Sequence, residues 1–473
     1  MMRSFSLILI TFVSNIILAQ DNDLQTISNI GLKVVEITTV NQEEPTCDFV
    51  EAPEGCMGAT CINSTKVPCR IIISESGNIL YDSGDYIKNV SGATIKINGN
   101  TSAYYTVGKN YPYKIKLQKK SDLLFRDNDI YADKDWRLIN DAISLNTIIG
   151  LKLSEIMQFP WTPKYTPCNI FINGDYRGCY LLIESVKKNN SCRIDVDDTG
   201  YIVERDPYWW SENKYFSTNY FSSDKGYRWT WKYPDDDLVT FSQEQYITDY
   251  INNAEESINN DTYEKYIDVL SFARWVLAHD ILGTRDSGGS NLYVSKYDDS
   301  QNSILQIPCI WDFDSNFQMQ PGQFSRIHTA AYDFYFDNLF KKNNKSFSKA
   351  YKKLWQQIYP TLLNDITSFI DEYINSEEGT ALNESRKHHF KRWNYGITTI
   401  DVEEDALEAK SWFNTHLQLL NDRINIINGI NNTLNNNHIT VTNDYYYTIN
   451  GYKTTSVNKG IYIKGRKKIF LRR

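Results

Sequence analysis

The first third of the chain alternates short apolar runs with turn residues, which is typical of a β-rich region. Residues 31–40 and 70–73 are rich in β-branched and aliphatic side chains, and turn-forming residues bound both segments. Residues 94–97 form a third such run, which leads into a loop of small residues at 98–102. In residues 113–117 polar and apolar side chains alternate, as in a strand with one buried face. We therefore predict strands at these four runs.

A helix and a hairpin are predicted next. Apolar side chains recur at helical spacing in residues 144–157, and the pattern stops before Pro160. Residues 169–172 and 179–184 are apolar runs on either side of a candidate turn at 173–174. The resulting order is strand, loop, strand, helix and two strands. This order occurs in the N-terminal lobe of protein kinases, but many other α+β domains share it.

The second half of the chain is predicted to be mainly helical. Apolar side chains at helical spacing occupy four segments, at residues 243–258, 263–282, 347–374 and 402–427. Before them, residues 201–240 are aromatic and irregular in pattern. We favour an insertion that packs on the helical half, because aromatic side chains supply buried area more often than exposed stacking faces. The alternative is a platform that binds a glycan or a peptide.

The composition divides the chain into units. Residues 426–438 are rich in asparagine and read as a linker. Residues 439–473 alternate in short β-like runs and are expected to form a small separate β module, which resembles the C-terminal sorting modules of exported Bacteroidota proteins through the runs GIYI and GRKK. An ordinary hairpin with a basic end is the alternative. The remaining boundaries are a leader at 1–20, a Cys-containing β-rich region at 21–90 and a central domain at 91–425.

The leader has the features of a signal peptide. Arg3 supplies a positive charge, residues 5–18 are mostly apolar, and Ala19 is small enough for cleavage. A membrane anchor is the alternative, but the apolar stretch is short for one, and no later segment has the roughly 20 apolar residues that a spanning helix needs. We expect a secreted or cell-surface protein with no transmembrane segment after cleavage.

Cysteine usage agrees with an oxidising compartment. Four of the eight cysteines crowd one region, at Cys47, Cys56, Cys61 and Cys69. Their spacing lacks two close Cys-x-x-Cys pairs, so disulfides are favoured over a zinc site. If residues 173–174 form a two-residue turn, Cys168 and Cys179 face each other within disulfide distance. A longer turn would break that register.

The net charge of −8 argues against a broad nucleic-acid surface and against nucleic acid as a partner. It does not exclude a small anionic substrate, because a local site can differ in sign from the whole chain.

Two segments carry the residue types that phosphoryl transfer requires. That reaction needs a group to orient the attacking hydroxyl, oxygen ligands for Mg²⁺ and a cation on the phosphates. Asp286 is followed five positions later by Asn291, which is the spacing of a kinase catalytic loop. The pair is predicted to lie between a helix and a β-like run. Alone, this spacing is weak, because the chain is rich in Asp and Asn.

The second segment is an apolar run at residues 304–311 that leads directly into Asp312 and Asp314. We predict a strand there, with both carboxylates at its end and able to face one side. Hard carboxylates suit Mg²⁺ or Mn²⁺. Asp312 is the first choice for a metal ligand, in the position of the kinase DFG aspartate, and Asp314 is a second candidate. A solvated turn is the alternative.

These blocks together resemble the CotH kinases. The resemblance runs over about residues 90–320 and rests on KING-NTS, YPYKIKLQKK, DKDWRLIND, FINGDYRGCYLLIESVK, GYIVERD, LGTRDSGGSNLYV and IPCIWDFDSNF, in that order. It implies an atypical protein-kinase fold of the α+β class, with a β-rich N-terminal lobe and a mainly helical C-terminal lobe. It further implies binding of ATP with Mg²⁺ or Mn²⁺ and phosphorylation of an exported or surface protein, with a cell-envelope component as a further possible partner.

The resemblance assigns roles residue by residue. Asp286 is the expected catalytic residue, and Asn291 joins Asp312 and Asp314 as metal ligands. Lys114 or Lys116 would reach the ATP phosphates, and strand alternation puts both lysines on one face, so the sequence does not choose between them. Both could instead be ordinary solvent-facing lysines. Glu184 ends the hairpin where a kinase hinge would begin and would lie near the adenine, unless it is a surface acid.

Two departures from the family pattern keep other functions open. Asn98 stands where the family commonly has an arginine, and Asn146 lies near the expected place of another. Besides an active kinase, we therefore consider a pseudokinase that serves as a surface structural or adhesion protein. A glycan-binding surface protein that uses the cluster of Trp209, Trp210, Trp229 and Trp231 is a third reading. A hydrolase fits less well, because no two carboxylates stand out as acid and nucleophile.

Overall fold

The computed structural model describes residues 23–140, 144–219, 226–286, 291–328, 334–394 and 401–430, together with four short strands between 446 and 471. The predicted signal peptide lies outside these residues, as does most of the predicted Asn-rich linker. Helix α10 continues through Ile430 and so includes the first residues predicted for that linker.

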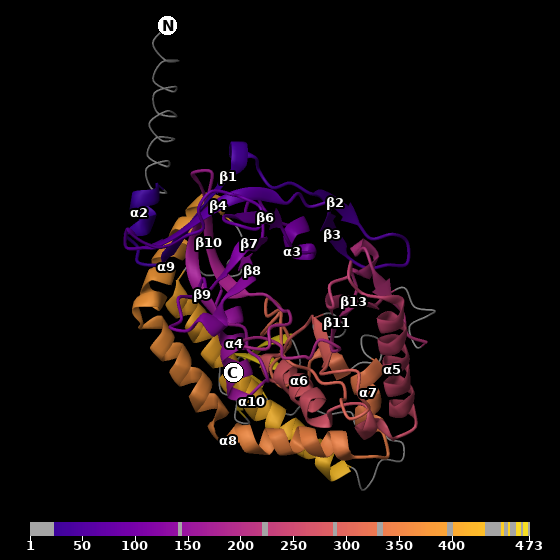
Figure 1. Ribbon diagram of the computed structural model, residues 1–473. Helices are drawn as coiled ribbons and strands as arrows, with labels where there is room; N and C mark the ends of the chain where they lie inside the picture. Colours follow the sequence, from indigo (N-terminus) through magenta and orange to yellow (C-terminus); the bar gives the residue numbers. More distant parts are fainter. Residues whose placement is uncertain are drawn as a thin grey trace.

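The N-terminal part folds into a closed barrel of seven strands (Figure 1). The strands are β1 (Lys33–Thr39), β4 (Val67–Glu75), β6 (Ala93–Ile97), β7 (Tyr113–Ser121), β8 (Asp133–Ile139), β9 (Tyr165–Ile172) and β10 (Asp175–Glu184). The barrel closes because β1 pairs on both of its edges, antiparallel with β4 and parallel with β9. Strand β5 (Asn78–Asp82) extends the sheet from β4 outside the ring. The predicted α+β class with a β-rich N-terminal region is confirmed, and the ring closure is a feature that we did not predict.

Alternation along the strands creates the barrel core. In β6 and β7 every second side chain is buried, and these side chains include Ile95, Ile97, Tyr113 and Ile115. Strands β9 and β10 are buried on both faces, because helix α9 packs on their outer side. Strands covered on both faces read as continuous apolar runs rather than as alternating ones.

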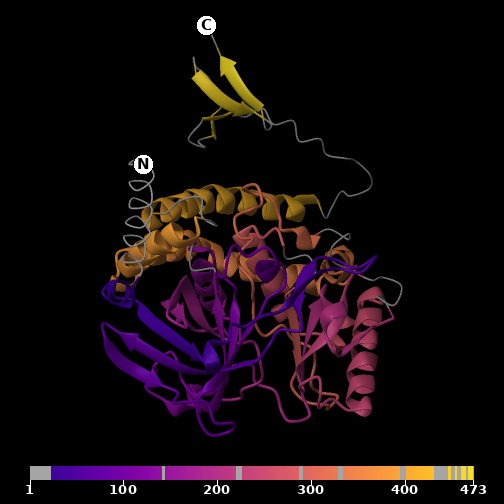
Figure 2. The same ribbon diagram turned by 90° about the horizontal axis from the view of Figure 1, so that it is seen from above.

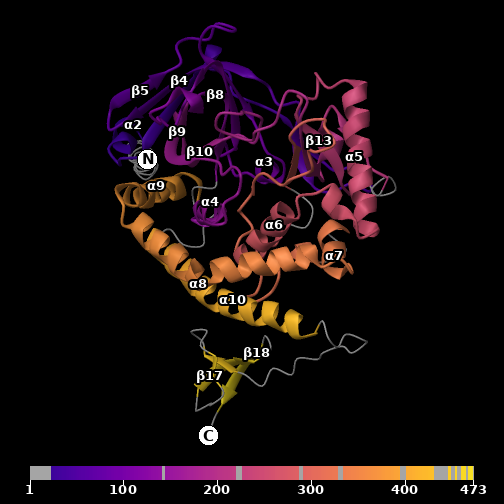
Figure 3. The same ribbon diagram turned by 60° about the horizontal axis from the view of Figure 1, so that its bottom comes forward.

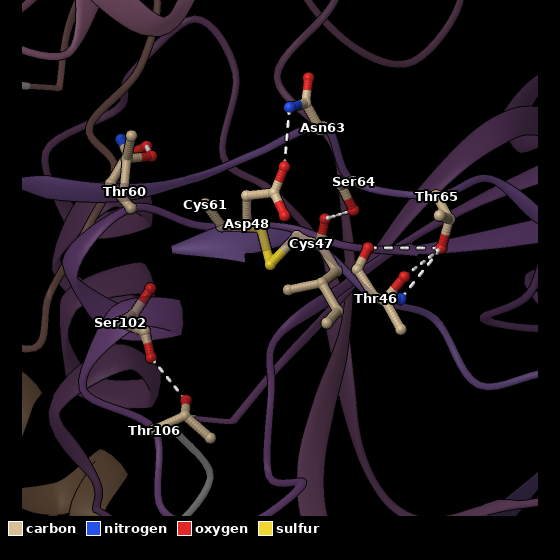
Figure 4. The surroundings of a disulfide bond; sticks show 12 residues. Thr46, Cys47, Asp48, Thr60, Cys61, Asn63, Ser64, Thr65, Ser102 and Thr106 are labelled. Atoms are coloured by element: carbon tan, nitrogen blue, oxygen red, sulfur yellow. Dashed lines mark hydrogen bonds between the residues drawn. A yellow bond between two sulfur atoms is a disulfide. The ribbon is translucent and has the colours of Figure 1, made fainter. Parts of the chain in front are cut away.

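A disulfide-bonded hairpin, β2 (Asp48–Glu51) with β3 (Ala59–Ile62), leaves the barrel between β1 and β4. Figure 4 shows the Cys47–Cys61 disulfide, with Thr46 and Thr65 hydrogen-bonded beside it. This pair confirms one disulfide within the predicted cysteine cluster. The remaining two members, Cys56 and Cys69, are free, and Cys69 is buried in the barrel core.

The hairpin of β9 and β10 corrects the expected pairing of Cys168 with Cys179. Its turn has two residues, as expected, because Ile172 pairs with Asp175. A bulge at Arg177 then shifts the register by one, so Cys179 lies opposite Asn169. One residue of slip moves a side chain to the other face. Cys168 therefore packs inside the barrel, Cys179 packs outside it, and both thiols are free.

Residues 201–240, which we expected to be irregular, form most of a second sheet. Its strands are β11 (Tyr201–Asp206), β12 (Tyr215–Phe216), β13 (Arg228–Tyr233) and β14 (Leu292–Lys296), in the order β12-β13-β11-β14. Trp229 and Trp231 of β13 are buried in the main hydrophobic core. The predicted β-like run after Asn291 is confirmed as β14, but residues 304–311 make only isolated bridges at Leu305 and Gln306 instead of the predicted strand.

The long C-terminal helices, coloured orange and yellow, lie along one side of the two sheets, whereas α5 flanks the second sheet (Figure 2). The helices are α4 (Asn146–Ile156), α5 (Phe241–Asn259), α6 (Val269–Leu282), α7 (Phe334–Lys341), α8 (Ser346–Ile374), α9 (Glu377–Trp393) and α10 (Val402–Ile430), with the short α2 (Leu24–Ser28) and α3 (Thr101–Tyr104) nearer the N-terminus. Figure 3 shows α8 and α10 beneath α4 and α6, and α8 packs against all three. The predicted mainly helical second half is therefore present. A helix that crosses a bilayer must be both long and apolar, and no helix among the described residues has both properties.

Four short strands near the C-terminus form a sheet of their own: β15 (Tyr446–Thr448), β16 (Lys453–Thr454), β17 (Gly460–Lys464) and β18 (Lys467–Leu471). This agrees with the β character expected for residues 439–473, and whether the tail is a sorting module stays a prediction.

The bulge at Arg177 gives a stability prediction. Gly178 has φ +113°, and a Cβ there would lie 2.5 Å from Nδ1 of His389. Gly174 has φ +77° with open space around it. Gly174→Ala should cost only the backbone strain of about 1–2 kcal/mol. Gly178→Ala should cost about 1–3 kcal/mol more, because the helix α9 side chain must be displaced. Urea unfolding of both variants followed by circular dichroism measures the difference, and equal losses would contradict this account of the bulge.

Candidate active site

A cavity of about 540 Å³ lies between the barrel and the second sheet. Its barrel wall includes Asn98 and the loop that follows it, Arg137 of β8 and Ile183 of β10. Its other wall comes from β11, β13 and the start of β14, and the turn of the disulfide-bonded hairpin contributes Met57 and Gly58. Four predicted residues line this cavity, namely Asp286, Asn291, Asp312 and Asp314. Segments that are far apart in the sequence therefore meet here.

Asp286 follows α6 after a tight helix end. Gly283 terminates α6 in the left-handed region with φ 57°, and a Cβ there would lie 2.4 Å from the Trp412 ring. A glycine at this position is favoured because it ends the helix without a Cβ penalty. The Asp286 amide then donates to Oγ of Ser315 at 3.0 Å. The loop is thus attached to the segment that carries the other acids.

A side-chain hydrogen bond connects the two predicted metal-binding segments. Nδ2 of Asn291 donates to Oδ2 of Asp312 at 2.8 Å. Both residues have positive φ, 58° for Asn291 and 70° for Asp312. Residues other than glycine rarely adopt this region, although Asn and Asp tolerate it best. Strained backbone at a cavity wall is common at functional sites.

Helix α4 holds the acid-bearing segment from the barrel side. The ring of Phe313, which lies between the two acids, packs where a Cβ on Gly150 would be only 2.1 Å away. Nδ2 of Asn146 donates to the backbone oxygen of Asp314 at 3.3 Å, and Nδ2 of Asn316 donates to the Asn146 oxygen at 3.1 Å. Asn146 therefore holds this segment in place through its side chain and its backbone.

The carboxylates interact electrostatically. Loss of surrounding water raises the pKa of Asp314, although part of its surface faces the cavity, and the negative charge of Asp286 raises it further. Two carboxylates that share a site resist simultaneous ionisation. This arrangement favours a cation between them, because a positive charge removes the repulsion.

The predicted nucleotide-binding residues lie outside the cavity lining. Lys114 forms an ion pair with Asp135 at 3.4 Å. Burial lowers the pKa of Lys114 to about 8, which Asp135 opposes, and the positive charges of Arg137 and Lys96 lower it further. Lys116 is exposed. Glu184 is fully buried, where it accepts hydrogen bonds from Arg126 Nη2 at 2.9 Å and from the Lys164 amide at 3.0 Å.

Sequence reasoning missed a second group of charged residues in the cavity. Glu204 and Asp206 of β11 and Lys232 of β13 line it, and Lys232 Nζ contacts Glu204 Oε2 at 2.7 Å. The signal was the run Tyr201-Ile-Val-Glu-Arg-Asp, an apolar start that ends in acids, as residues 304–314 do. We used this run for the family resemblance but assigned its acids no role, because the surrounding region looked irregular.

Asp206 is the most perturbed acid of this group. Burial raises its pKa to about 7, and the charge of Glu204 adds to the rise. Lys232 and the Tyr208 amide oppose the shift, while Glu212 contributes to it. A carboxyl group that titrates near neutral pH in a cavity is a candidate functional group.

The raised pKa of Asp206 makes stability depend on pH. In the folded state the Asp206 carboxyl group keeps its proton up to about pH 7, whereas the ordinary pKa of an aspartate is 3.8. The stability that protonation contributes is therefore complete below pH 3.8 and lost as the pH rises through 7. Asp206→Asn should remove this dependence. The melting temperature of the variant minus that of the wild type should therefore increase by about 2 °C or more from pH 5 to pH 8. Asp237→Asn, which changes an exposed acid, is the matched control. If the difference in melting temperature from the wild type is independent of pH for both variants, the raised pKa of Asp206 is wrong.

Comparison with known proteins supplies the family. A family profile described as CotH kinase protein matches residues 95–421, which is most of the chain and includes both walls of the cavity. No curated protein matches the chain. The chain belongs to the CotH kinase protein family.

Proposed function

We propose that this chain is a protein kinase that transfers the γ-phosphate of ATP to serine or threonine hydroxyls of an exported or surface protein. The meeting of Asp286, Asn291, Asp312 and Asp314 at one cavity supports the proposal most directly. Family membership suggests the same reaction. The export of the enzyme rests on the predicted signal peptide at residues 1–20.

The reaction assigns a distinct task to each wall. Asp286 orients the acceptor hydroxyl and takes its proton as the oxygen attacks the γ-phosphorus. A bond from the hydroxyl oxygen to phosphorus forms, the bond from phosphorus to the bridging β-phosphate oxygen breaks, and ADP leaves with that electron pair. Cations on the barrel side offset the charge of the phosphates. Asp286 is a suitable base because its backbone is attached to the acid-bearing segment through Ser315.

The oxygen-rich donor set fits Mg²⁺ or Mn²⁺ held partly by substrate. Asn291 and Asp312 are already in contact at 2.8 Å, and Asp314 borders the same cavity. Within the part of the chain that the structure describes, no three His, Cys, Asp or Glu side chains gather closely enough to hold a metal by themselves. Mg²⁺ commonly uses one or two carboxylates and completes its shell with phosphates and water. When bound, the metal would neutralise charge on the phosphates.

In this proposal the barrel with its appended strand serves as the N-terminal lobe and the helical half as the C-terminal lobe. The nucleotide would occupy the cavity between them. Lys114 would act at a distance through its positive charge rather than by contact, because it does not border the cavity. Glu184 would support the barrel through its bonds to Arg126 and Lys164.

A nucleotide-binding pseudokinase is the second candidate. The observation that favours it is that the Asn146 side-chain amide is already committed to the Asp314 backbone. The family resemblance leads us to expect arginines at Asn98 and near Asn146, where this chain has uncharged side chains. The glycan-binding reading loses support, because Trp229 and Trp231 are buried in the core. Trp210 is half-buried and donates to the Met57 oxygen at 3.2 Å.

Loss of the Asp286 carboxylate and loss of the Asp312 carboxylate should impair phosphate transfer in different ways. Asp286→Asn should lower the rate of phosphate transfer by about 10²–10⁴-fold with nucleotide affinity retained, because the base acts only in the chemical step. Asp312→Asn should weaken nucleotide binding only when Mn²⁺ is present. Labelled ATP, Mn²⁺ and a panel of serine- and threonine-rich acceptors measure transfer, and calorimetry measures binding.

Asp127→Asn, which removes an exposed acid outside the cavity, should behave as the wild type. Nucleotide binding without transfer to any acceptor, in the wild type as in Asp286→Asn, would support the pseudokinase instead. A wild type that binds no nucleotide would exclude both readings.

A further inference from the structure

Three cationic residues lie side by side on the outer face of the barrel. Lys96 of β6 pairs with Lys114 of β7, and Lys114 pairs in turn with Arg137 of β8. Their strand neighbours Ile95, Ile97, Tyr113, Ile115, Trp136 and Leu138 all point into the barrel core. The three cations therefore project together from the opposite face, on the side where Arg137 borders the cavity.

This row carries more positive charge than its neighbours neutralise. Lys114 has an ion-pair partner in Asp135. Burial lowers the pKa of Lys96, as do the positive charges of Lys66 and Arg137, and the negative charges of Glu212 and Asp236 only partly oppose this shift. Among the described residues, no carboxylate lies within ion-pair distance of the Arg137 guanidinium. Adjacent cations that are partly withdrawn from water without full compensation are costly, and an anion between them would relieve that cost.

The surroundings of Arg137 orient its guanidinium without neutralising it. With the Asn98 amide turned so that its oxygen faces the donors, that oxygen accepts from Arg137 Nη1 at 2.9 Å and from the Gly99 amide at 3.1 Å. The guanidinium also lies over the Trp311 ring, 5.7 Å from its centroid. Nε of Arg137 is buried and has no hydrogen-bond partner in the described structure. A guanidinium oriented in this way keeps its positive charge at the cavity wall, where it can bind a phosphate oxygen through a charge-assisted hydrogen bond.

We propose that Arg137 binds a phosphate group of the nucleotide. The inference rests on the proposed function and adds the residue that meets the phosphates. Trp311 immediately precedes Asp312, so the guanidinium lies beside the segment that carries the proposed metal ligands. Arg137 contacts Asn98, so a cation from β8 reaches the loop of small residues on the cavity wall. The alternative role is structural, in which Arg137 only pins the loop that starts at Asn98.

The test compares ATP with adenosine, because only ATP carries the phosphates. Isothermal titration calorimetry with Mn²⁺ measures both ligands on the full chain for the wild type, Arg137→Lys, Arg137→Gln and the double variant Arg137→Gln with Asn98→Arg. We expect Arg137→Gln to weaken ATP binding by about tenfold or more, because a charge-assisted hydrogen bond to phosphate is lost. The affinity for adenosine should stay unchanged. Arg137→Lys should lose less ATP affinity than Arg137→Gln, because it keeps the positive charge. The double variant should bind ATP more tightly than Arg137→Gln, because Asn98→Arg returns a cation to the same part of the cavity wall.

Lys119→Gln is the matched control, since it removes the same charge from an exposed position on the same sheet, outside the cavity. If Arg137→Gln binds ATP as tightly as Lys119→Gln does, Arg137 does not bind phosphate. If Arg137→Gln and Arg137→Lys lose affinity for ATP and for adenosine to the same extent, the role of Arg137 is purely structural. That result would overturn the inference and leave the proposed function in place. A wild type that binds neither ligand would instead remove the proposed function itself.

Discussion

The packing of the Phe313 ring against Gly150 is the contact on which the candidate site depends. No side chain fits at residue 150, because even a Cβ would lie 2.1 Å from the ring. Phe313 is the residue between Asp312 and Asp314, so this one buried ring determines where both carboxylates project. Helix α4 lies between the barrel and the helical half, and it also bonds the acid-bearing segment through Asn146. The cavity therefore takes its shape from a contact between apolar groups, and the charged groups follow from it.

A buried carboxylate anchors the opposite side of the same loop. Asp280, in the last turn of α6, is fully buried. Its oxygens accept from Ser325 N and Oγ at 2.8 Å each and from Tyr351 Oη at 2.9 Å, and His328 Nε2 lies 2.7 Å away. Burying a carboxylate is tolerated only when it is well hydrogen-bonded. These partners come from α8 and the segment before α7, so the helical half fixes the end of α6 from which Asp286 follows.

Local patterns predicted much of the fold, and they failed where distant segments decide. Alternation identified β6 and β7, and helical spacing identified α4. Closure of the barrel depends on β1 pairing with both β4 and β9, which no local pattern encodes. The strand at residues 201–206 was missed because all its residues are buried and the period of two is absent. The bulge at Arg177 was not predicted either, and there β10 packs against α9, which is far along the chain.

The candidate site shows the same limit in its charges. An apolar run ending in acids was enough to nominate Asp312 and Asp314, because the chemistry of metal ligation is local to that segment. The cation was assigned to Lys114 or Lys116 on one face of β7, yet Arg137, the cross-strand neighbour of Lys114, is the one that borders the cavity. Register between strands, not position within one strand, decides which cation of a row reaches a site. Asn98 and Arg137 are distant in the sequence, and only the pairing of the strands brings the guanidinium to the loop that starts at Asn98.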